Sequence, residues 1–133
     1  MREILFRGKR EDNGEWVEGG ILQDEGYVAI VVYSDYHGWH DFIEVIPETV
    51  SEFTGLTDKN GKKIFEGDIL KYKNFISKYN IGYVVYGTGC FSVKDIHSDN
   101  RPAIDIVLHE SKNDIEVIGN IHDNPELLKG GEG

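Results

Sequence analysis

The five histidines of this 133-residue chain are the side chains best suited to metal binding. Only His37 and His40 lie close together in the sequence. A helical zinc site needs two histidines four positions apart, and a structural zinc finger adds cysteines. Neither pattern is present, so we expect scattered surface histidines, no metal site and no cofactor.

Cys90 is the only cysteine and therefore the only thiol nucleophile in the chain. It follows a predicted turn and has no recognisable partner motif, so we interpret it as a small, half-buried apolar residue. The chain also lacks the Gly-x-Ser-x-Gly elbow and the phosphate-binding loop. Its many carboxylates do not single out a general acid by spacing. We therefore predict no catalytic residue and no enzyme activity.

Lysine and aromatic residues alternate in residues 59–86, where they suggest a nucleic-acid interface. Residues 61–90 carry five basic and two acidic side chains, whereas the whole chain carries 14 and 24, a net charge of −10. Lysines follow a phosphate backbone and aromatic rings stack on bases, but the overall negative charge repels nucleic acid. Weak single-stranded binding is therefore our alternative hypothesis. Its residues are Lys59, Lys62, Lys63, Lys71, Lys73, Lys78, Phe65, Tyr72, Phe75, Tyr79, Tyr83 and Tyr86.

Residues 34–41 are predicted to form a loop that is rich in aromatic and histidine side chains. Tyr36, His37, Trp39 and His40 make up our candidate partner surface. Protein interfaces favour Trp and Tyr, and loops on a rigid β scaffold commonly carry recognition. The alternative is that Trp39 folds back over the sheet as a lid.

Strands are the elements most favoured by the composition. Ile and Val together number 26, whereas Ala and Leu together number 9, and branched side chains favour a pleated sheet. The paired glycines at 19 and 20 indicate a bulge or a close backbone approach within one strand. Asn124, Pro125 and Glu126 predict one short helical turn near the C-terminus, stopped at Gly130. The predicted strands cover residues 15–22, 27–33, 42–46, 50–54, 69–73, 81–86, 90–95, 104–109 and 115–122.

Gly67 and Asp68 are predicted to shape a structural corner before one of these strands. Glycine permits a sharp turn, and an Asp carboxylate can accept backbone N–H bonds and fix that turn. A role for Asp68 as an acid, a base or a metal ligand is the weaker interpretation.

Four stretches of the sequence together resemble the YopX family of phage and prophage proteins. They are FRGKR at 6–10, NGEWVEGG at 13–20, FTGLTDKNGKKIFEGDIL at 53–70 and EVIGNIHDNPELL at 116–128. His122 and Tyr86 depart from the residues that are usual in the family. The resemblance implies a mostly β protein with a C-terminal SH3-like barrel, and it implies no activity.

We therefore expect a small N-terminal β region, residues 1–55, packed on an SH3-like β-barrel, residues 56–133, with a single compact unit as the other arrangement. No apolar run approaches the ~20 residues of a membrane helix, and no export signal is visible, so we expect a cytoplasmic protein with no membrane contact. The best hypothesis is a non-enzymatic accessory or interaction module. Its partner would be a host or phage protein with a basic patch, and a homo-oligomer stays open.

Overall fold

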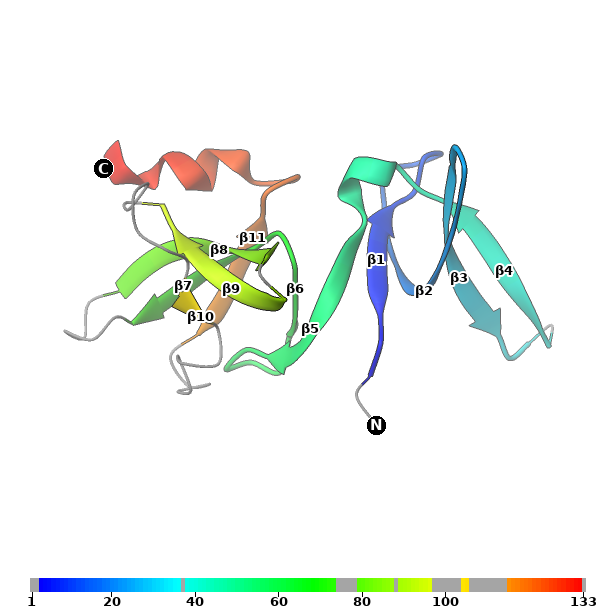
Figure 1. Ribbon diagram of the computed structural model, residues 1–133, viewed down its shortest axis with the longest axis horizontal. Helices are drawn as coiled ribbons and strands as arrows, with labels where there is room; N and C mark the ends of the chain where they lie inside the picture. Colours follow the sequence, from blue (N-terminus) through cyan, green and yellow to red (C-terminus); the bar gives the residue numbers. More distant parts are fainter. Residues whose placement is uncertain are drawn as a thin grey trace. The chain divides into compact units, whose positions relative to one another are not determined.

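The computed structural model describes residues 3–36, 38–73, 79–87, 89–96, 104–105 and 115–132 (Figure 1). The protein is mostly β, as the excess of branched residues predicts. The strands are β1 (Phe6–Lys9), β2 (Trp16–Asp24), β3 (Tyr27–Ser34), β4 (Trp39–Glu44), β5 (Ser51–Thr57), β6 (Lys63–Phe65), β7 (Asp68–Lys73), β8 (Tyr79–Gly87), β9 (Cys90–Asp95), β10 (Ile104–Asp105) and β11 (Glu116–Asn120), and the 3-10 helices are η1 (Pro47–Thr49) and η4 (Pro125–Glu132).

The chain divides into two compact units, residues 1–55 and 56–133. One sheet has the strand order β4-β3-β2-β1-β5-β6, and the other has the order β10-β9-β8-β7-β11. In the first unit, β1 to β4 form successive antiparallel hairpins, and β5 returns to pair with β1. Strand β4 is therefore an edge strand of its sheet.

The core of the first unit is small and includes Ala29, Ile30, Val45 and Phe53, all of them buried. The predicted close backbone approach in β2 is confirmed at Gly19. A Cβ atom at this position would overlap the carbonyl oxygen of Val31 on β3. Glycine therefore allows the two strands to pack where any other residue would push them apart.

Trp16 on β2 packs against two basic side chains of the neighbouring strand β1. The guanidinium carbon of Arg7 lies 4.7 Å from the centre of the indole ring, and the Lys9 ammonium lies 5.6 Å from it. Arg7 is buried, and its Nε donates a hydrogen bond to Ser51 Oγ at 3.2 Å. These contacts fix β1 between β2 and β5 through cation–π attraction and hydrogen bonding.

The second unit has the larger hydrophobic cluster. Its polar member is Tyr72, whose hydroxyl donates to Asp95 Oδ2 at 2.8 Å. Burial, together with this hydrogen bond and the charge of Asp95, raises the pKa of Tyr72 far above its ordinary value, so the phenol stays neutral. The buried members of the cluster are Ile64, Leu70, Tyr72, Val84, Val93 and Ile115.

Gly67 and Asp68 form the corner between β6 and β7. Gly67 has a φ of +86°, which favours glycine, and its N–H donates to Val84 O at 2.9 Å. Its own carbonyl accepts the N–H of Ile121 at 2.9 Å. Asp68 is only 1% exposed, and its Oδ2 accepts the N–H of Phe65 at 2.8 Å. The backbone of this corner is therefore bonded to β8 and to the residue after β11.

We expect Asp68→Ala to lower the free energy of unfolding by roughly 1–2 kcal/mol, because the buried N–H of Phe65 loses its acceptor. Denaturant unfolding of the second unit, monitored by hydrogen exchange of its amides, measures this change in unfolding free energy. Asp68→Asn keeps an acceptor oxygen and should lose less. Unchanged stability of the alanine variant, with loss of a biochemical activity, would contradict a structural role for this carboxylate.

Some features of the fold differ from the predictions. The sheet of the second unit is open in the described residues, with β10 and β11 at its edges, so a closed SH3-like barrel goes beyond the observed strand order. The single helical turn is instead an eight-residue 3-10 helix, η4, which continues through Gly130. Strand β6 has three residues and is absent from the predicted strands, because so short a segment shows no alternation.

Candidate functional site

The β3–β4 hairpin replaces the loop that was predicted at residues 34–41. Strand β3 extends to Ser34 and β4 begins at Trp39, so that prediction is wrong for Ser34 and for residues 39–41. Ser34 pairs with Trp39 and Tyr33 pairs with His40. Gly38 has a φ of +74° and makes the reversal tight enough for the strands to pair up to the turn.

Aromatic side chains are widely exposed on this hairpin. Trp39 is 57% exposed, so more than half of its surface is open to a partner. Tyr36 in the turn is 91% exposed, and Phe42 is 57% exposed. His37, the remaining member of the predicted surface, lies outside the described residues.

The predicted surface residues are divided between the two faces of the hairpin. Side chains alternate along a strand, and directly paired residues share a face. Tyr33 and His40 therefore lie on one face with Phe42, and the Tyr33 and His40 rings are 5.1 Å apart. Trp39 lies on the opposite face. The sequence placed Phe42 beside this aromatic cluster but did not indicate Tyr33, because Tyr33 ends a predicted strand whose pairing with His40 a local pattern does not show.

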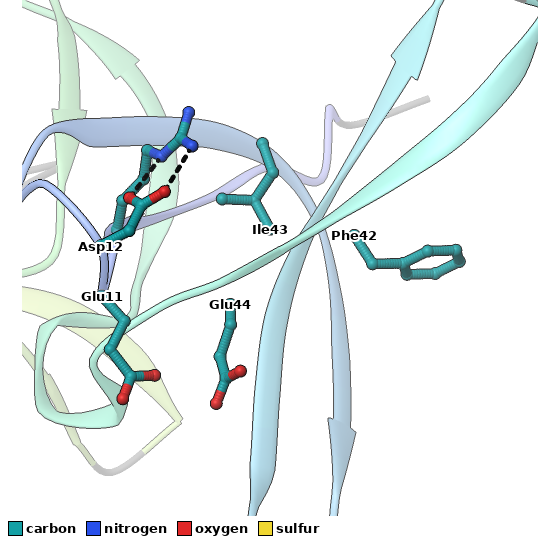
Figure 2. A pocket seen from close by; sticks show the side chains of 6 residues that line it. Glu11, Asp12, Phe42, Ile43 and Glu44 are labelled. Atoms are coloured by element: carbon teal, nitrogen blue, oxygen red, sulfur yellow. Dashed lines mark hydrogen bonds and ion pairs between the residues drawn. The ribbon is translucent and has the colours of Figure 1, made fainter.

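An open pocket of about 390 Å³ lies at the end of β4, near the turn between β1 and β2 (Figure 2). Figure 2 shows the Glu11 and Glu44 side chains next to each other on one side of β4, with Ile43 on the other side. Apart from Phe42, the residues that line this pocket were not candidates in the sequence, because its two segments are at least 30 positions apart. The pocket is lined by Arg10, Glu11, Asp12, Phe42, Ile43 and Glu44.

The electrostatics of the pocket favour a cationic ligand group. Arg10 binds Asp12 through two hydrogen bonds, of 3.0 and 2.8 Å, so its charge is largely neutralised. The hydrogen bond with Arg10 lowers the pKa of Asp12. Glu44, through a hydrogen bond and its like charge, raises the pKa of Glu11. An added positive charge would relieve the repulsion between these two carboxylates.

The residues of the nucleic-acid hypothesis do not form one exposed surface. Phe65 and Tyr72 are buried, so they cannot stack on bases. The Lys71 and Lys73 ammonium groups lie 4.8 and 5.4 Å from the centre of the Tyr79 ring. Lys59 lies 3.8 Å from the Glu116 carboxylate. Lys78 and Phe75 lie outside the described residues.

We expect weak nucleic-acid binding at physiological salt, because the described lysines are few and the chain is strongly acidic. Fluorescence anisotropy of a labelled oligothymidine, measured at 50 and 200 mM salt, tests this expectation. Tight binding that falls by orders of magnitude with salt would promote the nucleic-acid hypothesis. Lys71→Gln with Lys73→Gln is the informative variant, since both lysines lie beside an exposed tyrosine.

The described part of the chain also bears on metal binding, on the cysteine and on membrane-spanning helices. No group of three His, Cys, Asp or Glu residues there is placed to hold a metal ion. Cys90 is partly buried, and its Sγ lies 3.7 Å from Gly87 O and 3.9 Å from Ser92 Oγ. No helix among these residues is long and apolar enough to cross a membrane.

The fold and this site define a mostly β protein with an exposed aromatic hairpin. Six aromatic side chains of the described residues are exposed, and four of them lie on the acidic β3–β4 hairpin. The chain belongs to the YopX family, because the family model described as "YopX protein" matches residues 5–129. The crystal structure of protein EF1440 from Enterococcus faecalis is similar, with a TM-score of 0.59 and 25% identity. The match covers 96% of this chain and 99% of that one. No curated protein sequence matches.

Proposed function

We propose that this protein is a non-enzymatic interaction module, and that the β3–β4 hairpin and its acidic pocket form the surface that binds another protein. The exposure of Trp39, at 57%, is the observation that carries the proposal. Exposed aromatic side chains on a strand gain free energy when a partner covers them. The charged residues around the pocket then select the partner by the sign of its charge.

The charge of the first unit indicates what kind of protein would bind. Residues 1–55 carry four basic and twelve acidic side chains, a net charge of −8. Such a surface attracts a basic protein patch and repels another acidic surface. Family resemblance to phage and prophage proteins supports a partner in the cytoplasm of the host cell, either a host or a phage protein.

The proposed binding surface lies within the first unit, and the second unit takes no part in it. Its sheet of β7, β8, β9, β10 and β11 has the strand number of a small SH3-like barrel, and the family resemblance supports such a barrel as part of this proposal. Barrel closure would leave fewer free strand edges in the second unit.

Trp39→Ala is expected to weaken binding of the partner by roughly 2 kcal/mol, a value typical of an interface tryptophan. The partner is obtained by affinity capture from lysate of the host, and its dissociation constant is then measured by calorimetry with the purified protein. The fold should be unaffected, because Trp39 lies at the end of an edge strand and contributes little to the core.

Tyr86→Ala is the matched control, because Tyr86 is also an aromatic residue that is 57% exposed, on β8 of the second unit. This variant should bind the partner as the unmodified protein does. Equal capture by the Trp39 and Tyr86 variants would contradict a binding role for the hairpin. Loss of capture by the Tyr86 variant alone would move the interface to the second unit.

A further inference from the structure

Hydrogen bonding along the β3–β4 hairpin determines which groups of β4 point away from the sheet. Val45 N–H donates to Val28 O at 3.2 Å, so this pair is of the hydrogen-bonded type. In an antiparallel ladder the two types of pair alternate. The backbone groups of Trp39, Asp41 and Ile43 therefore point toward β3. Those of the residues between them, His40 and Phe42, point outward.

Contacts of Glu44 confirm this alternation and show where the open edge ends. The Glu44 carbonyl, which points outward in the same series, accepts the N–H of Glu11 at 3.1 Å. Strand β4 pairs only with β3, and the outward N–H and C=O groups of His40 and Phe42 make no hydrogen bond within the described chain. The free edge of β4 thus runs from the turn to the pocket.

This edge carries two charged side chains, Asp41 and Glu44, but it lacks the other common features that prevent another strand from adding to it. Natural edges are commonly blocked by lysine, proline or a bulge, and β4 has none of these. Five of its six residues are exposed, and Phe42 is 57% exposed. An added strand would satisfy the outward backbone groups of His40 and Phe42 and would cover part of the phenylalanine ring.

Side chains beside the edge specify the chemistry of the added strand. Phe42 and Glu44 are two positions apart and share a face, and Glu11 lies next to Glu44 (Figure 2). An extended peptide also repeats every two residues on one face. A residue next to Phe42 would be apolar, and the residue two positions along would lie beside two carboxylates.

We propose that the free edge of β4 binds an extended segment of another protein by strand addition, with an apolar residue against Phe42 and a Lys or Arg two positions away against Glu11 and Glu44. This inference rests on the proposed function and names the chemistry of the partner. Charge complementarity favours it over a second copy of this chain, which would bring another net charge of −8 to the same edge.

A synthetic peptide that repeats Lys-Thr-Val-Thr three times tests the proposal, with a Glu-Thr-Val-Thr peptide of the same length as its control. Titration into isotopically labelled protein should shift the amide signals of His40 and Phe42 and slow their hydrogen exchange. Glu11→Gln with Glu44→Gln should weaken binding about fivefold, as expected for two partly exposed charge contacts. Glu25→Gln with Glu48→Gln removes two exposed charges elsewhere in the unit and should have no such effect.

His40→Pro and His40→Ala separate the backbone of the edge from its side chains. Proline removes the outward N–H and should weaken peptide binding by roughly tenfold or more, whereas alanine keeps the N–H and should bind nearly as the unmodified protein does. Amide spectra of both variants establish that each is folded. If the proline variant does not fold, N-methylation of alternate peptide residues removes the same hydrogen bonds from the ligand side.

Several outcomes would overturn strand addition. Equal binding of the basic and acidic peptides, or no shift at His40 and Phe42, contradicts it. A dimer at micromolar concentration that His40→Pro dissociates would assign the edge to a second copy. If the captured partner depends on Trp39 but is unaffected by His40→Pro, the interaction module stands while strand addition at β4 fails.

Discussion

Replacement of Asp58 by alanine is expected to lower the free energy of unfolding of the second unit by roughly 3–4 kcal/mol. The side chain is 4% exposed, and both of its oxygens accept backbone hydrogen bonds. Oδ1 accepts the N–H groups of Asn60 at 2.8 Å and Lys62 at 2.9 Å. Oδ2 accepts the N–H of Val117 on β11 at 3.0 Å. Alanine would leave three N–H groups without this acceptor.

The stability that Asp58→Ala loses should depend on pH in the direction expected for a carboxylate. Burial alone would raise the pKa of Asp58, but hydrogen bonds from Val117, Lys62 and Asn60 outweigh it, so its folded pKa lies below the ordinary value. The stability gained from the charged form is therefore present above the unfolded pKa, ~3.9, and is lost as the pH falls through the lower folded pKa.

Hydrogen exchange of β7 and β11 amides at pH 7 and in acid measures this contribution within the second unit. Asp58→Asn should lose stability at pH 7 and show less dependence on acid. Asp35→Ala removes an exposed carboxylate from the hairpin turn and serves as the control, with little expected change. A second unit that is equally stable in the Asp58 and Asp35 variants would contradict this role.

Gly19→Ala is expected to destabilise the first unit by about 2–3 kcal/mol, because the added methyl group would overlap the carbonyl oxygen of Val31. Backbone cannot move aside as a flexible side chain can, so β2 and β3 must separate or twist. Trp16 and Trp39, the only tryptophans, both lie in this unit, so tryptophan fluorescence during denaturant unfolding reports on it specifically.

Gly20→Ala is the matched control for this substitution. A Cβ atom at Gly20 would lie 3.8 Å from the Val31 Cβ and 3.9 Å from the Val31 oxygen, which are ordinary contacts. Alanine at this neighbouring position should therefore change the unfolding free energy by less than about 1 kcal/mol. Equal effects at positions 19 and 20 would show that loss of glycine flexibility, and not the close approach, determines the cost.

The sequence predicted which segments form strands better than it predicted which segments lie next to each other in the fold. β9 matches its predicted range, residues 90–95, and β2, β3, β7 and β8 lie within about two residues of theirs. Branched residues and turn signals act locally, so their pattern identifies strands. The prediction failed at residues 34–41, where polar and glycine residues suggested a loop but pairing with β3 extends the strand.

The pocket and the Asp58 hydrogen bonds could not be predicted for the same physical reason. Glu11 meets Glu44, and Asp58 meets Val117, across separations that a local pattern does not encode. Two of the three bonds to Asp58 come from N–H groups two and four positions along the chain, as is typical of an Asp in a turn. The third bond depends on the register of β11.

The bond from Val117 to Asp58 has a consequence for synthesis on the ribosome. The pairings among β1 to β4 join residues that are near in sequence. They can therefore form early as the chain emerges. The second sheet instead needs β11, near the end of the chain, both to pair with β7 and to donate to Asp58. Until β11 emerges, β7 lacks one neighbour, and nascent chains would be most exposed to proteolysis and aggregation during this interval.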